Sequence, residues 1–193
     1  MACGYKTQPL YVVKSLHRLR FTIDAARLPH QIVAMFELNQ MDWTNKATGY
    51  AELEKHLRAL LQGERDFIAN CANTTALLWH SLPDLNWVGV YRLVENELIL
   101  GPFQGKPACV RIKIGKGVCG TAAASRKTVL VPDVHEFPGH IACDSASQSE
   151  IVVPLVRDGQ LLGVLDLDSP MLNRFDAADQ AGLEKLAAVL MGA

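Results

Sequence analysis

Two apolar, β-branched runs on either side of the dipeptide Asp158-Gly159 constrain the fold of this 193-residue chain more than any other feature. The runs cover residues 150–156 and 161–167, and an Asp-Gly pair between such runs is the strongest short-range signal for a β-hairpin. A hairpin pairs its two strands antiparallel. The feature therefore predicts antiparallel strands near the end of the chain.

A second hairpin is predicted upstream. Residues 87–94 alternate between two faces, which places Trp87 and Tyr91 on the same side, and Glu95-Asn96 is a plausible turn into a returning strand at 97–103. An aromatic pair on one strand face belongs to a core more often than to a binding surface. The remaining strands are shorter and are expected at 110–114 and 128–131.

Apolar residues at three- and four-residue spacing predict helices on both sides of this strand-rich region. The helices are expected at 48–61, 64–82 and 176–190, with a short alanine-rich helix at 120–126. Because hairpins predominate and strands do not alternate strictly with helices, the predicted fold class is α+β. We expect one mostly antiparallel sheet with helices packed on it.

Residues 1–40 differ from the rest, because basic residues outnumber acidic ones and short apolar runs are broken by Pro9 and Pro29. The bias weakly resembles an organellar transit peptide, and another interpretation makes Met41 the true start. We expect residues 1–40 to be a peripheral N-terminal extension and residues 41–193 to form the functional domain.

Composition narrows the classes of function. The net charge of −1 gives no general indication of nucleic-acid binding or of an anionic membrane surface, and no apolar run is long enough to span a bilayer. Five cysteines, an odd number without a secretory signal, indicate a reducing compartment. They form no C-x-x-C pair and have no histidine at a typical zinc spacing, so the cysteines give no indication of a structural zinc site.

The cysteines differ in their surroundings. Cys143 lies in the polar segment HIACDSASQSE, where His140 would favour its thiolate if it were close, and Cys109 follows a glycine-containing loop. Cys119 is expected near the start of a helix, whose positive end would favour its thiolate. Cys71 falls in an apolar helical stripe and is expected in the core. Thiol redox chemistry and unreactive surface thiols both remain open on these observations.

Three carboxylates should meet through the Asp158-Gly159 turn. Glu150 opens one strand of that hairpin, and Asp166 and Asp168 close the other on a shared face. Desolvated carboxyl groups raise one another's pKa, and a protonated carboxyl can donate to a leaving oxygen. A solvated strand end and a divalent-cation site are the alternatives.

At these residues the sequence resembles a known family, the free methionine-(R)-sulfoxide reductases, which are GAF-domain enzymes that reduce the free amino acid. The likeness extends from about Tyr50 to Leu190. It rests on the segments NWVGVYRL (86–93), LGPFQGKPACVRIKIGKGVCGTA (100–122), VHEFPGHIACDSASQSEIVVPL (134–155) and GVLDLDS (163–169). The resemblance implies a GAF fold with about six antiparallel strands, helices on one side and a ligand pocket on the other.

The resemblance also implies an activity and its partners. The expected reaction is reduction of free L-methionine (R)-sulfoxide by a cytoplasmic homodimer that thioredoxin recycles, with no cofactor and no metal. Cys143 matches the family's nucleophile, Cys109 the cysteine that resolves it as a disulfide, and Cys119 a third cysteine, an alternative resolver. Each of these roles is what the resemblance implies, not what spacing establishes.

The remaining positions that match the family bind substrate. Trp87 and Tyr91 match the aromatic residues at the methyl-thioether end, and Glu150, Asp166 and Asp168 match the acids around the sulfoxide oxygen and the amino group. Two other classes of function compete with this one: a ligand-binding or redox-sensing GAF module, and a general thiol peroxidase. The lack of an attached output domain argues against a sensor.

Overall fold

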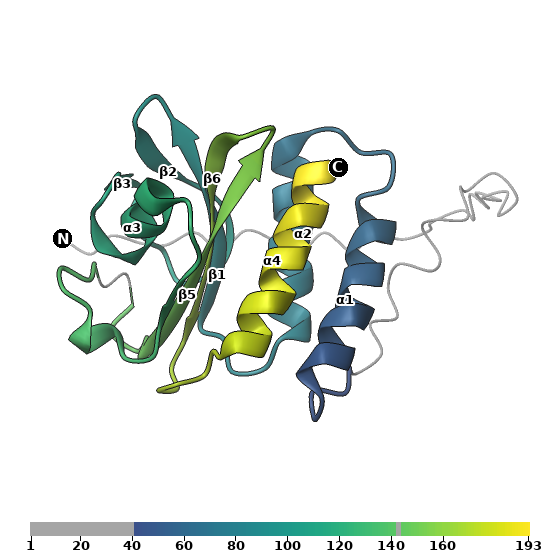
Figure 1. The fold of residues 1–193 in the computed structure, drawn as a ribbon, viewed down its shortest axis with the longest axis horizontal. Coiled ribbons are helices and arrows are strands. Elements are labelled where there is room, and N and C mark those ends of the chain that lie inside the picture. Colours follow the sequence, from purple (N-terminus) through teal and green to yellow (C-terminus); the bar gives the residue numbers. More distant parts are fainter. Residues whose placement is uncertain (1–40, 142–143) are drawn as a thin grey trace, which may run out of the picture. The chain divides into compact units, whose positions relative to one another are not determined.

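The computed structural model describes residues 41–141 and 144–193, which form one six-stranded antiparallel sheet with helices on both faces (Figure 1). The strand order is β3-β2-β1-β6-β5-β4. The expected α+β class is confirmed. The elements are α1 (Lys46–Leu60), α2 (Phe67–Ser81), β1 (Trp87–Val94), β2 (Glu97–Gly105), β3 (Arg111–Lys113), α3 (Gly117–Ser125), β4 (Val129–Val131), the 3-10 helix η2 (Val134–Glu136), β5 (Ser149–Arg157), β6 (Gln160–Ser169) and α4 (Ala177–Gly192).

Both predicted hairpins are present. Asp158 and Gly159 have φ values of 51° and 75°, the left-handed pair that a two-residue hairpin turn requires, and β5 and β6 pair on either side of them. At the other hairpin Glu95 has a φ of 57°. Strand β6 then pairs with β1, so the two hairpins join into the centre of one sheet.

The two faces of the sheet differ in character. One face is apolar: α2 and α4 lie against it, and α1 packs on α4 beyond them (Figure 1). Val88, Ile151 and Leu165 are fully buried on that face. The opposite face lies under α3, and it carries the polar residues that the sequence singles out. Period-two alternation along β1, β5 and β6 therefore separates a stabilising core from a candidate site.

Two helices begin three residues away from the predicted position. α2 begins at Phe67 and not at residue 64, because the Asp66 side chain accepts a hydrogen bond from the Ala69 amide at 2.8 Å and caps the helix there. α3 begins at Gly117, earlier than expected, which puts Cys119 inside its first turn. Among the helices of residues 41–141 and 144–193, none has the length and apolar character needed to cross a bilayer.

A buried polar cluster joins α1 to α4. Asp179 is fully buried, and its carboxylate accepts a hydrogen bond from the Tyr50 hydroxyl at 2.9 Å and pairs with Arg174 at 3.2 Å and with Lys46. The Tyr50 ring lies against the backbone of Gly182, where an added Cβ would come within 2.2–2.4 Å of three ring carbons. The close approach of α1 and α4 thus depends on the absence of a side chain at Gly182.

Gly182→Ala should lower the free energy of unfolding by about 1–3 kcal/mol through overpacking against Tyr50, despite alanine's higher helix propensity. Gly192→Ala in the same helix is the matched control, because nothing lies within 4 Å of a Cβ there. That variant should change stability by no more than about 0.5 kcal/mol. Urea denaturation of both variants measures the difference, and equal stabilities would contradict the packing argument.

Candidate active site

Strand register brings the three predicted carboxylates together on the face under α3. Glu150 lies opposite Asp168, and Asp168 lies opposite Trp87, so these residues form a row across β5, β6 and β1. Asp166 lies two residues before Asp168 on the same face of β6 and pairs with Gly89. Glu150 and Asp168 lie near the ends of β5 and β6, although both strands are inner strands of the sheet. The side chains of Glu150 and Asp166 are buried, so the alternative of a solvated strand end is excluded for these two residues.

Burial controls the charge of these carboxyl groups. The exposed fractions of Glu150 and Asp166 are 5% and 6%. Burial is the largest cause that raises the pKa of all three acids well above the ordinary carboxyl range, and the neighbouring carboxylates raise it further. The protonated forms are favoured, so the site holds carboxyl groups that can donate protons.

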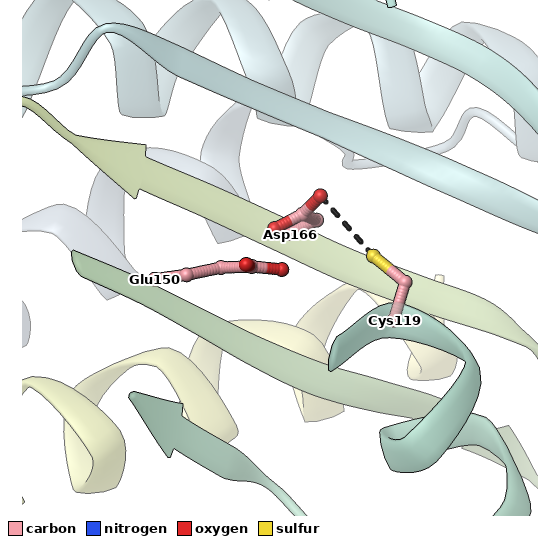
Figure 2. A group of neighbouring side chains, drawn as sticks. All are labelled: Cys119, Glu150 and Asp166. Atoms are coloured by element: carbon pink, nitrogen blue, oxygen red, sulfur yellow. Dashed lines mark hydrogen bonds between the residues drawn. The ribbon is translucent and has the colours of Figure 1, made fainter. Parts of the chain in front are cut away.

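Cys119, in the first turn of α3, lies against the acid cluster. Its Sγ lies 3.2 Å from Asp166 Oδ2 and donates a hydrogen bond to it (Figure 2). Burial raises the pKa of this thiol well above its ordinary value, and the charges of Asp166 and Glu150 raise it further. The expectation that the helix start favours a Cys119 thiolate is therefore wrong. Desolvation and adjacent carboxylates outweigh the partial positive charge of the helix end.

The aromatic pair of β1 forms one wall of the same site. Trp87 stacks against Tyr91 with ring centroids 5.8 Å apart and against Phe103 of β2 at 5.5 Å. Gly89 makes this stack possible, because a Cβ at that position would lie 2.3 Å from the Trp87 ring. Sequence reasoning did not single out Phe103, although its pairing with Gly89 across the predicted hairpin was a usable signal.

The polar atoms of the aromatic pair hold the segment that carries Cys109. The Trp87 indole N–H donates to the Lys106 carbonyl at 3.0 Å, and the Tyr91 hydroxyl donates to the Cys109 carbonyl at 3.0 Å. Both rings are almost completely buried, and Cys109 is half-buried. The aromatic wall thus fixes the backbone next to the predicted resolving cysteine.

Cys143, the predicted nucleophile, lies outside the described residues, but its neighbour Asp144 is held firmly. The Asp144 carboxylate pairs with the Lys106 ammonium at 3.0 Å and accepts hydrogen bonds from the Ala146 amide and from Asn86. The Ala146 amide, followed by Lys106, lowers the pKa of Asp144. Sequence reasoning missed this network, because nothing in the sequence pattern relates Lys106 to Asp144.

His140 lies beside Glu150, and its imidazole favours the neutral form. Its Nε2 is 3.5 Å from Glu150 Oε2, and burial lowers the pKa of the imidazole. The neutral ring is therefore favoured, which weakens the hypothesis that a His140 cation stabilises a thiolate.

The predicted core position of Cys71 is confirmed. Cys71 is fully buried in the opposite core, where burial raises the pKa of its thiol to about 12.

The cavity between these elements is narrow, about 30 Å³. A ligand of amino-acid size must therefore displace lining side chains. Within the described residues, one set of side chains has donor atoms close enough to hold a metal ion: Cys119, Glu150 and Asp166, within 4.8 Å of one another. The cavity is lined by Trp87, Tyr91, Ala108, Ile112, Lys116, Gly117, Val118, Cys119, His140, Ile141, Ser147, Glu150, Asp166 and Asp168.

Comparison with known proteins supports one family. The sequence model of the GAF domain matches residues 57–193. The free methionine-R-sulfoxide reductase of Escherichia coli (strain K12) is 54% identical over 146 residues, which cover 76% of this chain and 88% of that protein.

Solved structures that resemble this chain point to the same family. The free methionine-R-sulfoxide reductase of Neisseria meningitidis in complex with its substrate is 45% identical, has a TM-score of 0.76, and matches over 79% of this chain and 92% of its own. The fRMsr of Staphylococcus aureus in complex with substrate is 52% identical with a TM-score of 0.72, over 74% of this chain and 94% of its own.

Cys119 should react with iodoacetamide more slowly than Cys109 in the fully reduced, folded protein at neutral pH. The raised pKa keeps the Cys119 thiol protonated, so its labelling should increase only as the pH rises above the ordinary thiol value of about 8.5. Peptide mass spectrometry of timed reactions measures both sites. In urea the two thiols should label at similar rates, and preferential labelling of Cys119 in the folded protein would contradict this account.

Proposed function

Because the chain belongs to the GAF-domain family of free methionine-R-sulfoxide reductases, we propose that it reduces free L-methionine (R)-sulfoxide to L-methionine. The observation that carries the proposal is that buried carboxyl groups and aromatic rings line the same pocket. An apolar methyl-thioether group suits Trp87 and Tyr91. A sulfoxide oxygen and an ammonium group suit the cluster of Glu150, Asp166 and Asp168.

The chemical step uses a protonated acid. The sulfur of Cys143 attacks the sulfoxide sulfur, and a pocket carboxyl protonates the oxygen, which would otherwise depart as an oxyanion. The oxygen passes to the cysteine, so the thiol becomes a sulfenic acid and the sulfoxide becomes methionine. The raised pKa of each acid supports this role, because a carboxyl that is still protonated near neutral pH can donate.

The cysteine is then reset by disulfide exchange. Cys109 condenses with the Cys143 sulfenic acid, which releases water and forms a disulfide, and the dithiol of thioredoxin reduces that disulfide. The hydrogen bonds from Trp87 and Tyr91 to residues 106 and 109 support Cys109 as resolver, because they fix its backbone beside the pocket. Cys119 is the poorer candidate, since its buried thiol is held protonated beside Asp166.

The family resemblance supports the rest of the proposal. We propose a homodimer that works in the cytoplasm, where thioredoxin dithiols are available. We also propose that residues 1–40 are an extension peripheral to catalysis, since the family match covers residues 57–193. A chain that starts at Met41 should then retain the activity of the full chain in the assay described next.

An NADPH-coupled assay with thioredoxin and thioredoxin reductase tests the activity. Free methionine-(R)-sulfoxide should be reduced, whereas the free S epimer and a peptide-bound sulfoxide should react at least about 10-fold more slowly. The S epimer exchanges methyl and oxygen between their subsites, and the peptide-bound form lacks the free ammonium group that the acid cluster suits. Equal rates on all three substrates, or no rate on the R epimer, would contradict the proposal. Comparable turnover of peroxides would favour a thiol peroxidase, and ligand binding without turnover would favour a sensor.

Substitution of the cysteines separates the chemical step from recycling. Cys143→Ser should abolish methionine formation, because no nucleophile remains. Cys109→Ser should form about one methionine per enzyme and then stop, because the sulfenic acid is not resolved. Quantification of methionine with and without the thioredoxin system measures both effects. Cys71→Ala is the control and should recycle normally; normal recycling by Cys109→Ser would assign resolution to another thiol.

The single-turnover rate should fall as the pH rises through the raised pKa of the donating acid, because only the protonated carboxyl donates. Replacing that acid by its amide should slow the step by about 10²–10⁴-fold and remove this pH dependence. Rapid-quench measurements on Glu150→Gln, Asp166→Asn and Asp168→Asn identify the donor. Glu136→Gln, which alters an exposed carboxyl in η2, should leave the profile unchanged. A flat profile in the unmodified protein would refute acid catalysis.

A further inference from the structure

We propose that Cys119, Glu150 and Asp166 form a binding site for a soft divalent cation, of which Zn²⁺ is the representative, and that the bound cation blocks the pocket. The cation would be an inhibitor and not a cofactor, because it would occupy the groups that the reaction needs. The proposal of a binding site rests on the arrangement of the side chains in the structure. The inhibition rests also on the function proposed above.

The donor atoms lie close to the spacing that a zinc ion requires. They lie within 4.8 Å of one another, and Cys119 Sγ and Asp166 Oδ2 are 3.2 Å apart. Zinc bonds of about 2.3 Å to sulfur and 2.0–2.2 Å to oxygen place ligand atoms of a tetrahedral site roughly 3.5 Å apart. The three side chains come from α3, β5 and β6 and converge on one point (Figure 2). Small side-chain adjustments would thus complete the site.

A buried carboxyl oxygen gives further support. Within residues 41–141 and 144–193, no amide, hydroxyl, thiol or ammonium group donates to Asp166 Oδ1, and the neighbouring Glu150 carboxyl forms a hydrogen bond with the Asp166 side chain. The residue is 94% buried, given its exposed fraction of 6%; one of its carboxyl oxygens faces Cys119 and the other is turned toward Glu150 (Figure 2). The proton of that hydrogen bond holds the two buried carboxyl groups together, and a cation in the cluster would take its place.

The local charges also favour a cation. In the part of the chain that the structure describes, no lysine or arginine forms an ion pair with Glu150 or Asp166. A bound dication would let both carboxyl groups ionise, and the Cys119 thiol would release its proton to solvent as its sulfur binds. His140, a neutral imidazole 3.5 Å from Glu150, can supply a fourth donor. The thiolate ligand selects zinc over magnesium or calcium.

Binding can be tested without turnover. The reduced full chain with Cys109→Ser and Cys143→Ser is titrated with Co²⁺, a spectroscopic substitute for Zn²⁺, under anaerobic conditions. A thiolate-to-cobalt charge-transfer band should appear, and Zn²⁺ should abolish it while Mg²⁺ does not. Addition of Cys119→Ser to this background should remove the band. A band that survives in that triple variant, or no band in the double variant, would overturn the site.

Two further substitutions separate a ligand from a nearby charge. Glu150→Gln should weaken Zn²⁺ binding by more than the roughly 10–100-fold that loss of a second-shell partner costs. Asp168→Asn is the matched control, because Asp168 belongs to the same acid row but not to the ligand set. It should weaken binding less than tenfold. Calorimetric titration measures both, with circular dichroism to verify folding, and equal effects of the two substitutions would contradict specific ligation.

Inhibition is measured in a single turnover, without thioredoxin, so that the cation acts on this protein alone. Zn²⁺ should raise the concentration of methionine-(R)-sulfoxide needed for half-maximal rate, and excess substrate should restore the rate. Cobalt binding without any sulfoxide reduction would support the metal site but refute the proposed function. Sulfoxide reduction that saturating Zn²⁺ does not slow would refute the inhibition.

Discussion

The structure of this pocket depends on three carboxyl groups that are gathered in one place on the sheet, two of them buried. Glu150 and Asp166 lie on inner strands under α3, where water cannot solvate their charges, and Asp168 lies half-buried beside them. Their pKa values are raised, so their folded forms favour protonation more than the unfolded chain does. The stability they contribute is present at low pH and is lost as the pH rises through the raised values. The fold bears this cost at neutral pH, in exchange for carboxyl groups able to donate protons.

The opposite face of the sheet provides the stability that makes this arrangement possible. Residues such as Val88, Ile151 and Leu165 alternate with the site residues along the same strands and are fully buried against the helical layer. A slip of one residue in strand register would exchange the two faces. The left-handed turn at Asp158-Gly159 starts this pairing, and an irregularity between Leu155 and Val156 shifts it. The turn and this irregularity together determine which side chains enter the pocket.

A second layer of interactions connects the parts of the chain that carry the cysteines. Lys106 accepts the indole hydrogen bond of Trp87 through its carbonyl and pairs with Asp144 through its ammonium. Tyr91 holds the carbonyl of Cys109 in the same way. The aromatic residues therefore have two roles. They form an apolar wall, and their polar atoms position the loop on which the proposed disulfide chemistry depends.

The sequence alone determined the strands, both hairpins, the core position of Cys71 and the common face of the acids, because these follow from local turn chemistry and from period-two alternation. The family resemblance supplied the roles proposed for Cys143 and Cys109. Only the tertiary structure decided the environment of Cys119, the stacking of Phe103 and the ion pair between Lys106 and Asp144. The electrostatics of a thiol and the partners of a side chain depend on residues far away in the sequence, and folding alone brings those residues together.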